Sequence, residues 1–243
     1  MNEGNLRKLW DNYALAGYEK VYSTNSTKQL RRIMSDLFLE LESSNSKVVD
    51  LGCGTGGLFK TVVQRICPGE LVAVDWSQEM LTRAREEALR VQAHDSGVRF
   101  EFILADLTKP LVWENNTFDS VIANLVICYL PGGWREPIKE LHRITKPGGN
   151  LYLSTFTNEW DFPSAVWRFA PREFLRAPIA TLYGIRFRNI AARISEQAKA
   201  SDAEYPARGE LTEYLEQVGF LDIVTSPIYW GFGLALRATK AST

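Results

Sequence analysis

The chain has 243 residues, in which 28 lysines and arginines stand against 29 aspartates and glutamates, for a net charge of −1. This length can bury a full core and suits one α/β domain with an appended cap, which disfavours two independent domains. The near-neutral balance gives no electrostatic reason to expect a nucleic acid partner and favours small, weakly charged ligands.

Cysteine usage and the start of the chain bear on where the protein works. Cys53, Cys67 and Cys128 lie far apart with no C-x-x-C spacing, so we expect reduced thiols. The chain opens without an apolar run of signal-peptide type, and its longest apolar stretch, residues 120–130, is too short to cross a bilayer. We therefore expect a cytoplasmic protein with no membrane partner.

The first predicted elements are a helix and a strand–helix–strand unit. Apolar residues recur every three to four positions from Ser26 to Glu42, which predicts an amphipathic helix. KVVDLG, at residues 47–52, is a short β-rich run stopped by glycine, LFKTVVQRIC predicts a helix, and ELVAVDW at Glu70–Trp76 predicts a second strand. Strand, helix and strand in about thirty residues are typical of a βαβ unit.

The alternation continues through the middle of the chain. Helices are predicted over Ser77–Gln92 and over WREPIKELHRIT, where KPGG at Lys146–Gly149 should stop the second helix. Further strands are predicted over Gly97–Asp106, Phe118–Ile127 and Asn150–Phe156.

Residues 157–207 break this rhythm. They are longer than an αβ connection needs and rich in aromatic residues, which predicts a helical lid. The alternation resumes with a helix over Glu210–Val218 and two strands, FLDIVTSPIYW and GFGLALRAT, joined too tightly for a crossover helix and therefore antiparallel. The sum is an α/β fold: a doubly wound, mostly parallel seven-stranded sheet with helices on both faces and one antiparallel strand near its edge.

The stretch VVDLGCGTGGL supplies the first chemical signal. Its glycines fit G-x-G-x-x-G at Gly52, Gly54 and Gly57, a pattern typical of nicotinamide dinucleotide sites. They also fit G-x-G-x-G at Gly52, Gly54 and Gly56, with Asp50 two residues ahead. In a doubly wound sheet this first strand-to-helix turn is where backbone approaches the ligand, so either pattern predicts a nucleoside site.

Acidic residues at the strand ends separate the two interpretations. Asp75, which ends the second strand, can accept both ribose hydroxyls in either case, while Ser77 is better placed to cap the following helix. A charge at Asp50 suits an ammonium group and would be awkward beside a pyrophosphate. Asp106, after the third strand, could accept from an adenine amino group or only cap a turn. No Y-x-x-x-K pair of a short-chain dehydrogenase occurs.

Taken together, VVDLGCGTGG, AVDWSQEML, LAD, FDSVIANLVICYL and LHRITKPGGNLYLS resemble the signature of class I S-adenosylmethionine-dependent methyltransferases, in the ubiquinone/menaquinone-biosynthesis-like group that acts on small molecules. The resemblance covers roughly residues 45–156, with an echo in GELTEYLEQVGF. It implies a Rossmann-like methyltransferase fold, S-adenosylmethionine as cofactor, S-adenosylhomocysteine as product, no metal, and a monomer or homodimer.

With that resemblance the chain divides into four parts. Residues 1–44 would form N-terminal cap helices and residues 45–156 the cofactor-binding core. Residues 157–207 would form the helical lid or substrate insert. A C-terminal helix and hairpin, residues 208–243, would complete the core.

The resemblance also implies the roles of individual residues. Asp50 would contact the methionine amino group, Asp75 the ribose diol, and Asp106 the adenine amino group, while Trp76 would flank the adenine. Asn124, at the end of the fourth strand, would lie near the methionine end. The implied cofactor-binding set is Asp50, Gly52, Cys53, Gly54, Gly56, Asp75, Trp76, Met80, Ala105, Asp106, Leu107, Asn124 and Leu125.

Candidates for the acceptor pocket are mainly aromatic. Pairs of aromatic residues in LWDNYALAGYEKVY share a helix face, where they could either line a pocket or bury themselves, and the insert adds two tryptophans. The substrate-binding candidates are Trp10, Tyr13, Tyr18, Tyr22, Trp160 and Trp167. Candidates for a catalytic base are Tyr129, Tyr18 and His142, the last of which the fold should place outside the sheet.

The predicted function is therefore methyl transfer from S-adenosylmethionine to a small aromatic or hydrophobic metabolite, on oxygen or nitrogen, mainly by positioning. A quinone-type C-methyltransferase is the alternative. An NAD-dependent oxidoreductase and a catalytically silent binding module are further rivals. A nucleic-acid methyltransferase is disfavoured, since ANLVICYL stands where an N-P-P-Y-like element would be expected.

Overall fold

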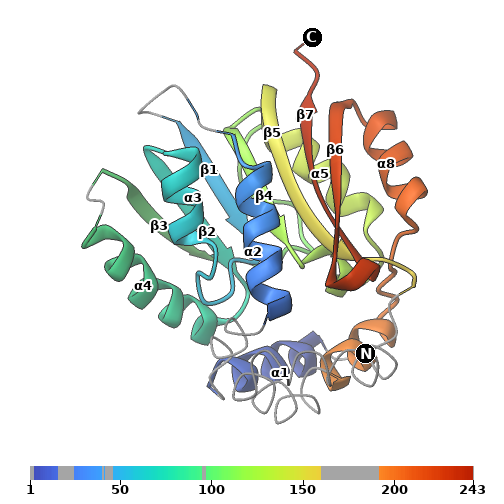
Figure 1. The fold of residues 1–243 in the computed structure, drawn as a ribbon. Helices are drawn as coiled ribbons and strands as arrows, with labels where there is room; N and C mark the ends of the chain where they lie inside the picture. The colour runs from blue at the N-terminus through green and yellow to red at the C-terminus, as the bar shows by residue number, and fades with distance from the viewer. Residues whose placement is uncertain are drawn as a thin grey trace.

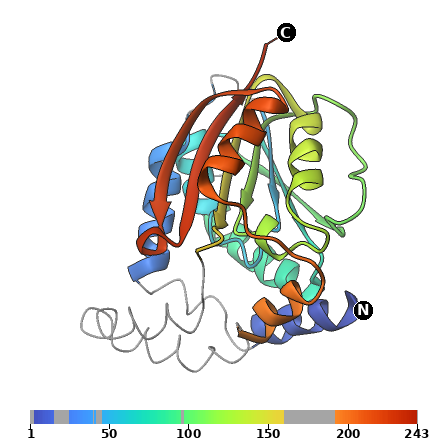
Figure 2. The same cartoon turned by 90° about the vertical axis from the view of Figure 1, so that its right-hand side faces the viewer.

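A computed structural model describes residues 3–15, 25–39, 41, 46–94, 97–159 and 192–242. Figures 1 and 2 show a central twisted sheet with helices packed on both of its faces. This is the α/β arrangement that the alternating strand and helix patterns predict.

The sheet has seven strands in the order β3-β2-β1-β4-β5-β7-β6. Every neighbouring pair is parallel except those made by β7, which runs antiparallel to both β5 and β6. The strands are β1 (Lys47–Leu51), β2 (Glu70–Asp75), β3 (Arg99–Leu104), β4 (Phe118–Asn124), β5 (Thr145–Phe156), β6 (Phe220–Ile228) and β7 (Gly233–Lys240). The predicted seven-stranded, mostly parallel sheet with one antiparallel strand is confirmed.

The direction of chain progress through the sheet reverses between β1 and β4. From β1 the chain moves outward to β2 and β3, and then returns to place β4 on the other side of β1. Ligands of doubly wound folds bind outside the carboxyl ends of the strands at such a switch point. The topology therefore directs attention to the residues that follow β1, β2 and β4.

Two apolar clusters hold the helices on opposite faces of the sheet. Successive residues of β1 alternate between them, since Val48 belongs to one cluster and Val49 to the other. Helices α2, α3 and α4 supply Met34, Phe59 and Leu81 to the first cluster, and helices α5 and α8 pack into the second. The bounds are α2 (Asn25–Leu37), α3 (Phe59–Ile66), α4 (Gln78–Gln92), α5 (Arg135–Ile144) and α8 (Arg208–Gln217).

Helix α1 (Glu3–Leu15) covers an end of the sheet instead of a face. Leu6 and Tyr13 of α1 pack with Ile194, which lies in a helical segment at residues 192–199. Figures 1 and 2 show α1 and this segment side by side at the end of the sheet from which the loops after β1 and β2 emerge. Two segments almost 180 residues apart in sequence thus form one roof, whose apolar side faces the strand ends.

The start of β5 differs from the sequence prediction. The helix ends before KPGG as predicted, since α5 ends at Ile144, but the strand was expected to begin at Asn150 and begins at Thr145. Lys146–Gly149 therefore form the first part of β5. The pairing of β4 with β5 shifts in register between Phe118 and Ser120. Gly149 permits this bulge, because a Cβ there would lie 2.9 Å from the Asp119 carbonyl oxygen.

The described helices also bear on the membrane prediction. Among them, none combines the length and the apolar character that a membrane span requires.

Candidate functional site

A cavity of about 260 Å³ lies at the carboxyl ends of the strands, beneath α1. Gly52, Asp75, Asn124 and Phe156 reach it from the ends of β1, β2, β4 and β5. Trp10 and further residues of α1 and of the 192–199 segment close it from the other side. The cavity therefore stands where the strand order places a ligand site.

The turn after β1 is built from left-handed glycines. Gly52, Gly54 and Gly56 have φ values of 68°, 55° and 78°, whereas Gly57 is not among the residues with positive φ. An added Cβ at Gly52 would also stand 2.3 Å from Cγ2 of Val126. The G-x-G-x-G pattern is therefore the one that the backbone requires, and the G-x-G-x-x-G reading has no conformational basis at its third glycine.

Asp75 is fixed by backbone on both sides. Its Oδ2 accepts from the amide of Gly54 at 2.9 Å, and its Oδ1 accepts from the amide of Ser77 at 2.9 Å. Ser77 caps α4, since its hydroxyl accepts from the Met80 amide at 3.1 Å, as the sequence predicts. Asp75 is 7% exposed, and this burial raises its pKa to about 6 despite the backbone donors.

Asp50 lies close enough to Asp75 to feel its charge, and one of its own carboxyl oxygens lacks a hydrogen-bond partner among the described residues. It is 2% exposed, and within the described residues its Oδ1 has no hydrogen-bond partner. Burial, and then the charge of Asp75, raise its pKa to about 8. A buried carboxylate of this kind is costly unless a cation or a donor completes it. Two such groups in one site predict a ligand that carries positive charge.

Asp50 lines a second, smaller cavity of about 60 Å³. Arg31 of α2 and Cys53 of the glycine loop also line it, so that a guanidinium group and a carboxyl group border the same small space. Gly52, Asn124, Leu125 and Tyr229 border both this cavity and the larger one. The two spaces therefore meet along a common wall at the ends of β1 and β4.

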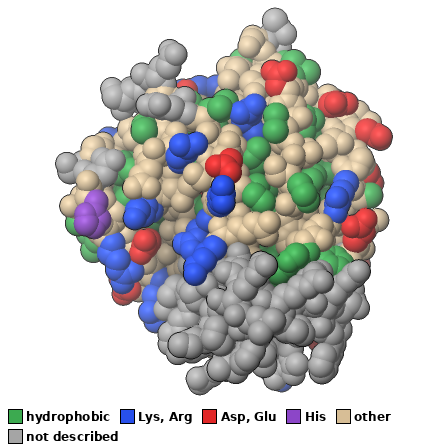
Figure 3. Space-filling view, in the orientation of Figure 1, with side chains coloured by type: hydrophobic (Ala, Val, Ile, Leu, Met, Phe, Trp, Pro, Cys, Tyr) green, Lys and Arg blue, Asp and Glu red, His purple; other side chains and the backbone are tan. Residues whose placement is uncertain are grey.

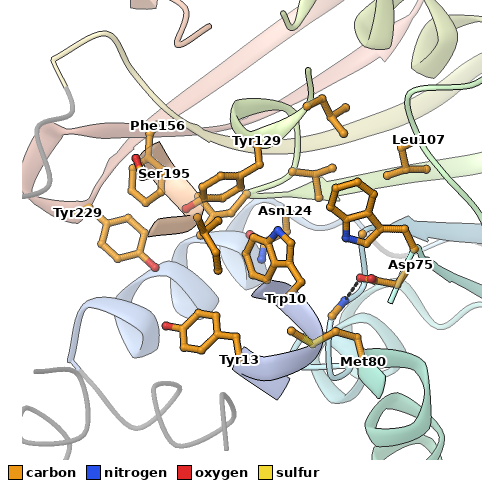
Figure 4. A pocket seen from close by; sticks show the side chains of 17 residues that line it. Trp10, Tyr13, Asp75, Met80, Leu107, Asn124, Tyr129, Phe156, Ser195 and Tyr229 are labelled. Carbon is orange, nitrogen blue, oxygen red and sulfur yellow. Dashed lines mark hydrogen bonds between the residues drawn. The ribbon is translucent and has the colours of Figure 1, made fainter. Parts of the chain in front are cut away.

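The larger cavity has two chemically different ends (Figure 4). Asp75, Met80 and Leu107 lie at one end, and Phe156, Ser195 and Tyr229 at the other. Ring contacts run along the second end, with centroid distances of 5.4 Å for Trp10–Tyr129, 6.4 Å for Tyr129–Phe156 and 5.3 Å for Phe156–Tyr229. This end is thus an aromatic pocket, to which Ser195 adds a hydroxyl that shares a 3.0 Å hydrogen bond with Tyr205.

Most of the residues predicted from the sequence border one of these spaces. Asp50 and Cys53 line the smaller cavity, and Trp10, Tyr13 and Tyr129 line the larger one. The predicted cofactor residues in the larger cavity are Gly52, Gly54, Asp75, Trp76, Met80, Leu107, Asn124 and Leu125.

Three predicted cofactor residues, Gly56, Ala105 and Asp106, are not among the lining residues of either space. The Asp106 carboxylate instead accepts from the amide and hydroxyl of Thr108, at 2.9 and 2.7 Å, so it caps a turn. Four further candidates, Tyr18, Tyr22, Trp160 and Trp167, lie outside the described residues.

The structure places His142 away from the cavity. It lies on α5, where its ring meets Phe220 edge-on with centroids 5.0 Å apart. Burial and the charge of Lys240 lower its pKa. Because α5 packs on a face of the sheet and the cavity opens at the strand ends, this candidate base does not reach the site.

Several lining residues escaped the sequence prediction, among them Phe156, Ser195 and Tyr229. Phe156 ends β5, and Tyr229 follows β6, which runs in the same direction as β1 and β4. The rule that ligands bind at the carboxyl ends of parallel strands could have indicated both. Ser195 gives no such signal, because its place depends on how the insert folds back.

The sequence is similar to those of several named proteins. Residues 48–149 match the family described as a methyltransferase domain. The chain is 24% identical over 234 residues to a demethylmenaquinone methyltransferase of Geobacillus stearothermophilus, with 94% of each chain covered. It is 26% identical over 208 residues to a malonyl-(acyl-carrier protein) O-methyltransferase of Brevibacillus brevis, with 83% of this chain and 65% of that one covered.

Among solved structures, the chain resembles phosphoethanolamine N-methyltransferase 2 of Haemonchus contortus in complex with S-adenosyl-L-methionine. The TM-score is 0.63 at 15% identity, with 95% of this chain and 57% of that one covered. At this identity the likeness concerns the fold.

The domain match and the named relatives support an S-adenosylmethionine-dependent methyltransferase, and the strand order agrees with the fold of such enzymes. Relatives named as demethylmenaquinone methyltransferases, at 24% and 23% identity, are proteins of the kind that the motifs resemble. The predicted enzyme class and fold are confirmed.

Proposed function

We propose that this methyltransferase holds S-adenosylmethionine across both cavities and methylates a small aromatic or hydrophobic metabolite in the aromatic pocket. When bound, that cofactor supplies a methyl group on a positively charged sulfur, which is open to in-line displacement. The supporting observation is the joint between an acidic, glycine-lined space and an aromatic one at the ends of β1 and β4.

The smaller cavity suits the amino acid part of the cofactor. Asp50 would accept a hydrogen bond from the ammonium group, which would give its Oδ1 a partner. Arg31 borders the same space and offers a positive charge to the carboxylate. A bound ammonium group would favour the ionised form of Asp50, and the site would then present opposite charges across about 60 Å³. Such a site matches a zwitterion better than a pyrophosphate, which carries only negative charge.

The acidic end of the larger cavity suits the nucleoside. Asp75 has two lone pairs committed to backbone amides and can offer the others to a ribose diol. Trp76, Met80 and Leu107 supply apolar contact for the adenine. The same carboxylate that shapes the glycine loop would thus orient the sugar.

The aromatic end suits the acceptor. Trp10, Tyr129, Phe156 and Tyr229 form a wall of rings that favours flat apolar molecules. Above it, α1 and the 192–199 segment cover the strand ends, which would keep water from the reacting atoms. We extend this role to residues 157–207 as a lid over the acceptor.

Positioning carries most of the rate in this proposal. Among the described residues that line the larger cavity, the only carboxylate is Asp75, and no histidine or lysine is present. Holding donor and acceptor at near-attack distance can supply about 7–11 kcal/mol. The acceptor then provides its own nucleophile, such as a neutral amine or an oxygen that ionises readily.

Methylation of a quinol-type ring carbon is the second candidate. It is supported by the relatives named as demethylmenaquinone methyltransferases, which match over 94% and 97% of this chain. A hydroxylated ring fits the same aromatic wall, and its own oxygen would activate the carbon. No metal is part of either proposal, and the described residues contain no group of three or more metal-ligating side chains.

The test is methyl transfer from isotope-labelled S-adenosylmethionine to a panel of quinols, phenols and amines, followed by mass spectrometry. We expect a gain of one labelled methyl group on an aromatic acceptor, and NMR of the product then assigns it to oxygen, nitrogen or carbon. A matched control is Asp36→Asn, which changes an exposed aspartate of α2, beside Asp75→Asn in the site. Equal transfer by both variants would contradict the proposed site.

A further inference from the structure

The tip of the C-terminal hairpin reaches the site where the two cavities share lining residues. Tyr229 follows β6 and borders both cavities. Figure 4 shows its ring beside Phe156, with the hydroxyl directed toward the side of Trp10 and Tyr13. The hairpin otherwise belongs to the far edge of the sheet, where β6 pairs only with β7.

The wall shared by the two cavities marks where the sulfur of the cofactor would lie. If the amino acid part occupies the smaller cavity and the nucleoside the larger one, the sulfur that joins them lies beside the residues that line both cavities. These residues are Gly52, Asn124, Leu125 and Tyr229. Gly52 follows β1, Asn124 ends β4 and Leu125 follows it. Among the described residues shared by both cavities, Tyr229 is the only one from outside the central strands and the only one with an aromatic ring.

The backbone at this tip adopts an uncommon conformation. Tyr229 and Trp230 have φ values of 47° and 54°, in the left-handed region that residues with a Cβ rarely occupy, and Gly231 follows at 97°. Such conformations persist when the surrounding structure fixes them, and they gather at ligand sites. Of these two residues, Tyr229 borders both cavities, so its side chain is the candidate for a role at this site.

Neighbouring segments hold the tip in place. The amide and hydroxyl of Thr157 both donate to the carbonyl of Phe232, at 2.9 and 3.1 Å. The amide of Phe232 in turn donates to the carbonyl of Tyr229 at 3.1 Å. Arg208, at the start of α8, donates to the carbonyl of Gly231. The ring of Tyr229 is thus presented to the wall by a fixed turn.

We propose that Tyr229 is a donor-binding residue at the reaction centre, whose ring face contacts the positively charged sulfur of S-adenosylmethionine. Aromatic rings attract cations over their faces, and the attraction grows where water is excluded. The neutral sulfur of S-adenosylhomocysteine keeps only the weaker thioether–ring contact and lacks the cation attraction. The ring therefore favours the donor over the product. This inference rests on the proposed function.

The test compares dissociation constants of S-adenosylmethionine and S-adenosylhomocysteine by titration calorimetry. Tyr229→Leu should weaken binding of the donor on the order of tenfold more than binding of the product. Tyr229→Phe keeps the ring and should preserve the ratio of the wild-type protein. Tyr229→Asn removes the ring with a residue that tolerates left-handed φ, so it repeats the test if the leucine variant does not fold.

Trp230→Asn is the matched control. Trp230 shares the left-handed backbone but is 43% exposed and borders neither cavity, so this variant should leave both dissociation constants unchanged. Equal weakening of both ligands by Tyr229→Leu, no change in either, or loss of the ratio in Tyr229→Phe would overturn the inference. A wild-type protein that bound neither ligand would instead overturn the proposed function.

Discussion

The two ends of the site are held together by different forces. At the donor end, backbone fixes the functional groups: Asp75 accepts from two amides, and the Cys53 amide ties the glycine loop to the Val74 carbonyl at 2.9 Å. At the acceptor end, side chains of α1, the insert and the hairpin meet through ring contacts and apolar packing. A fixed donor end suits one invariant ligand, whereas packed rings can be exchanged to suit different acceptors.

The largest effect on stability is expected at Asp50, at the donor end of the site. Its pKa rises from 3.8 in the unfolded chain to about 8 in the fold, so the folded state binds the proton more tightly. Stability from this group is then full below pH 3.8 and is lost as pH rises toward about 8. Replacement by asparagine removes this pH-dependent loss, which corresponds to on the order of 5 kcal/mol in the free energy of unfolding.

Chemical denaturation of wild type and Asp50→Asn at several pH values measures this effect without ligand. We expect the variant to gain stability relative to wild type as pH rises from 5 to 8, while its affinity for S-adenosylmethionine falls. A difference in stability that stays constant over this range would show that Asp50 is ionised and satisfied in the fold.

Gly52→Ala should destabilise the protein by on the order of 2–4 kcal/mol. The residue has φ of 68°, and the new Cβ would stand 2.3 Å from Val126. Thermal unfolding measures the loss, and Gly209→Ala is the matched control, since a Cβ there meets nothing within 4 Å. Adding Val126→Ala to the Gly52 variant should restore only the stability that is lost through the clash with Val126, and not the part lost through the positive φ. A Gly52 variant as stable as the Gly209 variant would contradict the required backbone conformation.

At the acceptor end, Phe156→Leu should raise KM for the acceptor several-fold and leave the Kd of S-adenosylmethionine unchanged. The reason is the loss of ring contacts with Tyr129 and Tyr229, each worth about 0.5–1.5 kcal/mol beyond area burial. Steady-state kinetics with titration of the donor separates the two effects. A variant that loses donor affinity in the same proportion would show that the two ends are not independent.

The smallest effect is expected at His142. It packs against Phe220 on the face of the sheet, and its lowered pKa keeps it neutral at pH 7. His142→Gln should therefore leave kcat and its pH profile unchanged. A loss of a hundredfold or more, the scale of a missing general base, would restore His142 as a catalytic candidate.

The same contrast explains what could be predicted from the sequence. The cap at Ser77 and the glycine turn depend on neighbours within a few residues, and local patterns indicated both. Asp75 was indicated by its place at a strand end, although its carboxylate also accepts from Gly54, 21 residues away. The roof and the aromatic pocket depend on contacts such as Tyr13 with Ile194, which are far apart in the chain. Periodicity carries no information about such contacts, so Ser195 could be found only in the fold, whereas the strand-end rule could have indicated Phe156 and Tyr229.

The start of one strand and the place of one candidate residue depend on contacts outside their own segments. KPGG has the composition of a helix stop, but pairing with β4 draws Lys146–Gly149 into a bulged strand, where Lys146 forms an ion pair with Asp119 at 2.8 Å. His142 was named as a candidate base because histidine is rare in the chain. The packing of α5 then settled its position.

The most direct test of the account is the affinity of the protein for S-adenosylmethionine, measured by titration calorimetry for wild type and for Asp75→Asn. We expect the wild type to bind, with NADH showing no binding, and the variant to bind on the order of a hundredfold more weakly, since a charged acceptor for the ribose diol is lost. Equal affinity of the two proteins, or a wild type that binds NADH instead, would contradict the central claim that this carboxylate and the left-handed glycine turn form a methyl-donor site.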